Sequence, residues 1–250
     1  MIQQLRQEWT DLGISRFLVI AYVRSPSAMY RSALQQHARL STNLRRFRPD
    51  RWTYRFRQRL EAWHQLFADQ LFVRPFDRPQ LHQGCVVADL RQTIHAALPD
   101  LPPIPFRPAS TAINESVTAE ELIAMQEWMQ RTPSQSADGS LRRSRALWKQ
   151  WSRLSRLRAA QQVSGTPVTL DPAVDQLIQR RHQDDLDWLA SRFGVQLPAP
   201  KLGGSTASAR AGAEPWPDSL EAADVLDGQL QDPWLTMVRS SLSSCRLPRD

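Results

Sequence analysis

Arg24 is the residue best placed to do binding chemistry, because it stands between a predicted strand and a predicted helix. Residues 17–23, FLVIAYV, have the β-branched and aromatic composition of a buried strand in a parallel sheet. Ser25 and Pro26 then favour a helix start, as the cap and the first helical residue. Open α/β sheets bind ligands at the carboxyl ends of strands, where a helix N-terminus adds N–H groups and partial positive charge. The sequence therefore predicts an anion site at Arg24, with the hydroxyl of Ser32, about two turns into the helix, as a second donor.

An arginine that follows a strand is also commonly a solvated or salt-bridged residue, which is the alternative interpretation of Arg24. The other polar residues of the sequence define no catalytic set. The five histidines are scattered, and His82 with Cys85 lacks a second pair of ligands, so we expect no metal site. Cys85 and Cys245 stand in unlike contexts, which indicates reduced thiols. We expect the aspartates of residues 184–187 to form a solvated acidic face.

The elements around the predicted site alternate between strand and helix at first and are helical afterwards. Besides the strand at 17–23, we expect a strand at 71–73 and helices at 3–12, 26–40, 51–68, 87–97, 118–132, 141–160 and 172–193. Thr118 and Glu121 form a capping box at one of these helix starts. Four tryptophans at helical spacing are expected in the core rather than as stacking platforms, namely Trp52, Trp63, Trp148 and Trp151.

Charge is the unusual feature of the composition. The net charge is +7, and 30 of the 32 basic residues are arginine, which suits bidentate phosphate contacts and also results from GC-rich coding. Residues 39–59 hold eight arginines and one acid, and residues 141–160 hold seven basic residues and no acid. Such stretches are typical of surfaces that bind nucleic acid or another polyanion, and equally of arginine-rich solvent-exposed helices.

The segment that carries Arg24 resembles the bacterial branch of the sulfotransferases, which use 3′-phosphoadenosine 5′-phosphosulfate as the sulfuryl donor. Arg24, Pro26, Ser32 and Gln35 match the family's 3′-phosphate-binding segment, a strand ending in Arg before a helix with Ser eight positions on. Three later stretches are similar to the family in the same order, and they are residues 75–89, 113–122 and 184–195. The resemblance covers about residues 20–196 and implies that Arg24 and Ser32 bind the 3′-phosphate of this nucleotide.

The chain departs from the family at its beginning. Family members begin with a strand and a phosphate-binding loop such as Lys-Thr-Gly-Thr-Thr, which holds the 5′-phosphosulfate. Lys149 and Lys201 are the only lysines, and neither lies in such a loop. The family's catalytic His or Glu lies between that loop and the Arg-x-Pro segment, a place that here precedes Met1. The sequence thus resembles the family without its first third, and the catalytic residues stay unassigned.

These patterns together predict the fold class and the domain organisation. We expect an α/β fold with a partial P-loop-type parallel sheet, a mostly helical C-terminal half and a disordered tail that contains one weak helix at most. Residues 1–200 would form the sulfotransferase-like domain, the C-terminal two-thirds of the family domain, and residues 201–250 the tail. The chain shows neither a signal peptide nor an apolar run near the roughly 20 residues of a membrane helix, which favours a cytoplasmic location.

The resemblance implies a nucleotide-binding transferase, incomplete as given, that moves a sulfuryl group from 3′-phosphoadenosine 5′-phosphosulfate to a hydroxyl acceptor. A glycan is the acceptor expected from the family. The alternative is an arginine-rich protein that binds nucleic acid or another polyanion without catalysis. The slightly acidic composition of residues 201–250 argues against nucleic acid as the partner, although charge alone does not separate the two functions.

Overall fold

A computed structural model shows a mixed α/β protein that is mostly helical and contains a small parallel sheet. It describes residues 2–102, 104–105, 117–131, 140–198, 216, 220–226 and 230–243, without the side chains of residues 140–146. The chain divides into two compact units. The first consists of Met1–Pro26, Thr53–Ala112 and Gln179–Ala199, and the second of Ser27–Trp52, Ile113–Ile178 and Pro200–Asp250.

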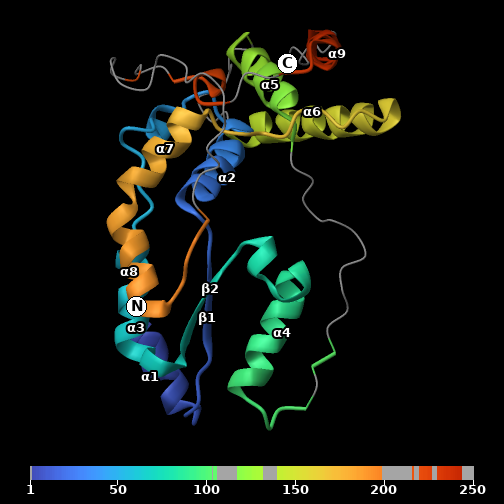
Figure 1. Ribbon diagram of the computed structural model, residues 1–250. Coiled ribbons are helices and arrows are strands. Elements are labelled where there is room, and N and C mark those ends of the chain that lie inside the picture. Colours follow the sequence, from blue (N-terminus) through green and yellow to red (C-terminus); the bar gives the residue numbers. More distant parts are fainter. Residues whose placement is uncertain are drawn as a thin grey trace. The chain divides into compact units, whose positions relative to one another are not determined.

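The first unit is built on two parallel strands, β1 (Val19–Val23) and β2 (Leu71–Pro75), which lie side by side in Figure 1. Val19 pairs with Leu71, and the register continues to Val23 opposite Pro75. Both strands are rich in the branched apolar residues that favour extended backbone. The parallel pair confirms the α/β class in its coarse form, while the P-loop type stays a prediction.

The two faces of this sheet are covered by different helices because side chains alternate along a strand. Val23, Leu71 and Val73 belong to an apolar cluster with residues of α3 (Phe56–Phe67) and α8 (Gln183–Phe193). The side chains of Tyr22 and Arg74 contact α4 (Val86–Ala97) instead. Helix α1 (Ile2–Asp11) packs near α3. The short 3-10 helices of this unit are η2 (Ala68–Gln70), η3 (Arg78–Gln80) and η4 (His82–Gly84).

The second unit is helical in the residues that the structure describes. Its helices are α2 (Pro26–Ala38), η1 (Arg45–Phe47), α5 (Ala119–Arg131), α6 (Ser140–Gln161), α7 (Pro172–Arg181), η6 (Ala222–Asp224) and α9 (Asp232–Ser243). The first residue of α2 and the last three residues of α7 belong to the first unit. Tyr30, Leu122 and Leu154 are among its fully buried side chains. The predicted capping box begins α5: Thr118 N–H donates to Glu121 Oε2 at 3.0 Å, and Glu121 N–H donates to Thr118 Oγ1 at 3.2 Å.

The single helix predicted at residues 172–193 is wrong, because the structure has α7 and α8 with a break at His182. The buried His182 accepts a hydrogen bond at Nε2 from the backbone N–H of Tyr54, at 2.9 Å. A hydrogen bond from a residue far away in the sequence therefore accompanies the break in the helix. Helical periodicity alone does not reveal this break. The predicted stop of α8 is confirmed, since Gly194 has the left-handed conformation at φ +66°.

The tail, predicted to be disordered apart from one weak helix, contains a helix at residues 232–243, and much of 201–250 lies outside the described residues. These residues form α9, which packs against α5. Its side chains Trp234, Leu235, Val238 and Leu242 are buried. They recur at helical spacing over three turns, a stripe too short to stand out in a polar segment. The predicted domain boundary near residue 200 stays a prediction.

Candidate functional site

Arg24 lies directly after β1, next to the first residue after β2. The N–H of Phe76 donates to the carbonyl of Val23 at 2.6 Å, so the pairing continues one residue beyond the strand ends. The guanidinium carbon of Arg24 lies 4.2 Å from the centre of the Phe76 ring, within the range of a cation–π contact. The Phe76 ring restricts the positions that the guanidinium can take. The structure thus places a cation at the carboxyl ends of the two strands, where the sequence predicted it.

Asp89 holds a second polar cluster at the same end of the sheet. It lies on α4 without solvent exposure and accepts hydrogen bonds from Arg74 Nε and Nη2, both at 2.6 Å. The hydroxyl of Tyr22 donates to it at 2.8 Å and the backbone N–H of His82 at 2.9 Å. Tyr22 and Arg74 are partners in the sheet register. One carboxylate therefore ties both strands and the start of α4 together.

The electrostatics of this cluster follow from its hydrogen bonds. Burial raises the pKa of Asp89, but the bonds from Arg74, the His82 N–H and Tyr22 outweigh it and hold the pKa at about 2. Burial and the bond to Asp89 raise the pKa of Tyr22 to about 12. Near neutral pH, Asp89 is thus a carboxylate, Tyr22 a neutral donor and Arg74 a cation.

Sequence reasoning did not identify Tyr22, Arg74 or Asp89 as a group. Asp89 is the last residue of the family-like stretch 75–89, and the resemblance assigned it no role. The position of Asp89 on the apolar side of a predicted helix could have indicated a buried ion pair, because a charged residue is buried in such a place only with a partner. The partner was not predictable, because Arg74 and Tyr22 meet only through the pairing of two strands whose partner residues are 52 positions apart in the sequence.

The second predicted site residue, Ser32, is partly buried on α2. Arg24 belongs to the first unit and Ser32 to the second. Helix α2 begins at Pro26, as the sequence predicted, so the helix start follows Arg24 closely along the chain. The role of Ser32 as a phosphate ligand stays a prediction from the resemblance.

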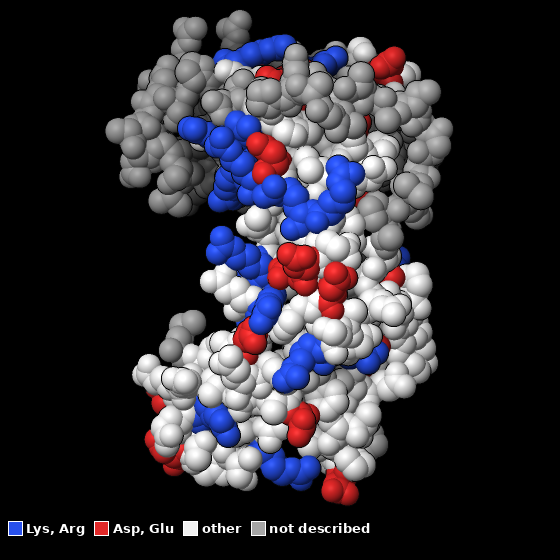
Figure 2. Space-filling view, turned by 60° about the vertical axis from the view of Figure 1, so that its left-hand side comes forward, with Lys and Arg blue, Asp and Glu red and all other residues white. Residues whose placement is uncertain are grey.

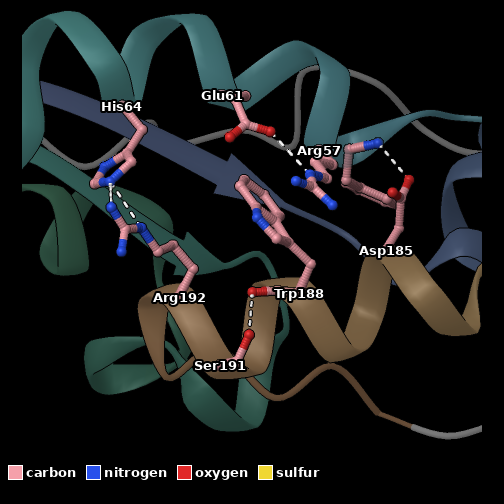
Figure 3. A network of polar contacts seen from close by, with 8 residues as sticks. Arg57, Glu61, His64, Asp185, Trp188, Ser191 and Arg192 are labelled. Carbon is pink, nitrogen blue, oxygen red and sulfur yellow. Dashed lines mark hydrogen bonds and ion pairs between the residues drawn. The ribbon is translucent and has the colours of Figure 1, made fainter.

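A further polar network joins α3 and α8 in the first unit (Figure 3). Asp185 accepts a hydrogen bond from the backbone N–H of Phe56 at 2.7 Å, and Arg192 Nε donates to His64 Nε2 at 2.7 Å. Asp185 therefore caps the first turn of α3 from a neighbouring helix, so the prediction that it only forms part of a solvated acidic face is wrong. These contacts connect α3 with α8.

The predicted core tryptophans divide into two groups. Trp52 and Trp151 are buried and Trp63 packs against the core, but the side chain of Trp148 is 60% exposed, so its assignment to the core is wrong. Trp148 lies at the edge of the apolar stripe of α6, one turn before Trp151. On the face shown in Figure 2, basic side chains gather in groups, with acidic ones beside some of them.

Comparison of the chain with protein-family models, curated proteins and solved structures gave no significant match. In the part of the chain that the structure describes, every helix is too short or too polar to cross a bilayer. The chemistry of Arg24 and its surroundings therefore has to be argued from the residues themselves.

Proposed function

We propose that the strand ends at Arg24 bind the 3′-phosphate of 3′-phosphoadenosine 5′-phosphosulfate, the donor in a sulfotransferase-like reaction. The observation that carries the proposal is the place of Arg24, after β1 of a parallel pair, beside Phe76 and just before α2. A cation at the carboxyl end of a parallel strand, followed by a helix start, is suited to an anionic ligand.

The type of cation favours a phosphate. A guanidinium presents several N–H donors in one plane and binds phosphate oxygens in pairs. The contact with Phe76 limits the conformational freedom that Arg24 loses when a ligand binds. Phosphate binding at this place agrees with the resemblance of residues 24–35 to the 3′-phosphate segment of sulfotransferases.

Asp89 contributes by fixing the sheet end rather than by contacting the ligand. Its bonds to Tyr22 and Arg74 hold the final residues of both strands in register. Arg74 is partly exposed and adds positive charge near the strand ends, and the paired Asp89 largely balances it. In this proposal, the attraction for a phosphate comes chiefly from the Arg24 guanidinium and from the helix start that follows it in the chain.

The transfer reaction itself rests on the resemblance. The resemblance implies a hydroxyl acceptor, with a glycan as the expected class, while the proposed cytoplasmic location rests on the sequence pattern alone. We assign no residue of this chain to the transfer step or to binding of the 5′-phosphosulfate. We thus propose a nucleotide-binding protein of sulfotransferase type. Binding of the sulfuryl donor is the part of this proposal that Arg24 and Ser32 make testable.

Calorimetry with the full chain tests binding of the nucleotide part of the sulfuryl donor. It compares the affinity for adenosine 3′,5′-bisphosphate with the affinity for adenosine 5′-phosphate. A hydrogen bond to a charged group contributes about 1.5–3 kcal/mol, so Arg24→Ala should weaken binding of the bisphosphate about ten- to a hundredfold. Ser32→Ala should cost less, about 0.5–1.5 kcal/mol, because a hydroxyl is a neutral donor. Neither change should affect adenosine 5′-phosphate, which lacks the 3′ group.

Arg91→Ala is the matched control, because Arg91 is an exposed arginine of the same unit on α4. It should leave both affinities unchanged. Equal losses for both nucleotides in Arg24→Ala, or no difference between that variant and the wild type, would remove Arg24 from the site. Failure of the wild-type chain to prefer the bisphosphate would contradict the proposal as a whole.

A further inference from the structure

The exposed face of α6 in the second unit combines an aromatic ring with basic side chains. Trp148 is the one aromatic residue among the strongly exposed large apolar side chains that the structure describes. An indole exposed to water does not contribute the free energy that its burial in the core would provide. An aromatic side chain in such a place is therefore a candidate for contact with a partner.

The surroundings of Trp148 are held in place by the core. The buried Trp151 donates from Nε1 to the carbonyl of Arg39 at 3.1 Å. The guanidinium carbon of Arg39 lies 5.2 Å from the ring centre of Trp151 and 5.6 Å from that of Trp148. Arg39 is therefore anchored beside the exposed ring, and the two side chains form a fixed pair of aromatic and cation.

The same face of α6 continues with further basic residues. Lys149, Ser152, Arg153 and Arg156 are exposed, and all lie within about 140° of Trp148 around the helix axis. From Trp148 to Arg156 the helix rises about 12 Å, a length that spans two or three phosphates of an extended strand. Helix α6 contains no Asp or Glu in its 22 residues. We call Arg39, Trp148, Lys149 and Arg156 the α6 surface.

The chemistry of the α6 surface favours one kind of partner. Among residues 148–160, the exposed side chains are basic groups, the aromatic ring, two alanines and the hydroxyls of Ser152 and Ser155, with no carboxylate or amide to accept hydrogen bonds from sugar hydroxyls. A fitting partner carries regularly spaced anions and flat rings that stack on an indole. Single-stranded nucleic acid has both, and binds through stacking on aromatic side chains beside a basic track.

We propose that the α6 surface binds single-stranded nucleic acid, with Trp148 stacking on a base and Arg39, Lys149 and Arg156 contacting the phosphates. The sequence argued against a nucleic-acid partner because residues 201–250 are slightly acidic. It also predicted Trp148 to be a core residue rather than a stacking platform, and the exposure of this side chain contradicts that prediction. The inference concerns α6 and Arg39 of the second unit, and it uses none of the residues of the nucleotide proposal.

Fluorescence anisotropy of a labelled oligouridylate with the full chain tests the inference over a series of salt concentrations. Trp148→Ala should weaken binding about five- to a hundredfold, the equivalent of one stacked base, and leave the salt dependence unchanged. Trp148→Phe keeps an aromatic ring and should retain most of the affinity. Lys149→Ala with Arg156→Ala should reduce the slope of log K against log salt by about 1.4.

Arg16→Ala with Arg91→Ala is the matched control, because both arginines are exposed and belong to the first unit. This variant has the same change in charge and should bind like the wild type. Circular dichroism melts of all variants separate a binding defect from loss of folding, and Trp148→Phe keeps the test valid if the alanine variant unfolds.

Three results would overturn the inference. One is the absence of oligouridylate binding at low salt. Another is binding to which Trp148→Ala and the double variant are no more sensitive than the control. The third is a clear preference for heparin, or for vesicles of phosphatidylcholine and phosphatidylserine, over the oligonucleotide, which would assign the surface to a glycan or a membrane.

Discussion

Asp89 on α4 receives two 2.6 Å hydrogen bonds from the Arg74 guanidinium on β2, and the carboxylate has no solvent exposure. The pair joins a strand to a helix that begins 11 residues after that strand ends. The bond from Tyr22 extends this connection to β1. On the face of the sheet opposite the apolar cluster, this one carboxylate connects both strands to α4.

Asp89→Asn should destabilise the protein by about 1.5–3 kcal/mol, because an amide cannot accept both bonds from Arg74 and loses the charge. Urea unfolding at neutral pH measures the loss. Asp100→Asn removes an exposed carboxylate in the same unit and should change the free energy of unfolding little. A loss in Asp89→Asn no larger than that of the control would show that the cluster does not stabilise the fold.

Acid should remove the contribution of Asp89 in a defined pH range. The pKa of Asp89 in the folded protein is about 2, below the 3.8 of an unperturbed Asp, so the unfolded chain binds this proton more tightly. Its stabilisation is present above pH 4 and declines as the pH falls towards 2, with a total of about 2 kcal/mol. Unfolding of wild type and Asp89→Asn at pH 5, 4 and 3 should show their difference shrinking, and a constant difference would contradict the assignment.

Glu120 is a buried carboxylate that connects three segments of the second unit. It accepts the N–H of Thr166 at 3.1 Å through Oε2 and the N–H of Gln231 at 2.9 Å through Oε1. Glu120→Gln should cost about 1–3 kcal/mol, because the new amide group is a donor that faces other donors. Glu127→Gln on the same helix is the control and should cost about 0–1 kcal/mol, because its partner Arg239 is exposed. Equal losses in thermal melts would show that Glu120 is not a connecting residue.

Gly165 and Gly194 form a matched pair for backbone substitution. Both have positive φ, +65° and +66°, which costs an L-residue about 1–2 kcal/mol. A Cβ on Gly165 would overlap the Cγ2 of Thr118 and lie 2.8 Å from its Cβ, whereas a Cβ on Gly194 meets nothing within 4 Å. Gly165→Ala should therefore destabilise by about 1–3 kcal/mol more than Gly194→Ala. Urea unfolding of both variants measures the difference, and equal effects would mean that Thr118 moves aside at little cost.

The sequence by itself determined the features that depend on neighbouring residues. The strand before Arg24, the helix start at Pro26, the capping box of Thr118 and Glu121, and the helix stop at Gly194 agree with the structure. Each is encoded within a few residues, because side-chain periodicity, caps and left-handed glycines act over one or two helical turns.

The tertiary structure alone decided which polar groups meet and which side chains are covered. Asp89 meets Arg74 and Tyr22 only because two separate strands pair in parallel, and Asp185 caps α3 only because α8 lies beside it. Trp148 and Trp151 share one apolar stripe, yet only Trp151 is covered. A helical pattern defines the direction of each side chain, whereas burial depends on the element packed against that direction, and this is a property of the folded chain.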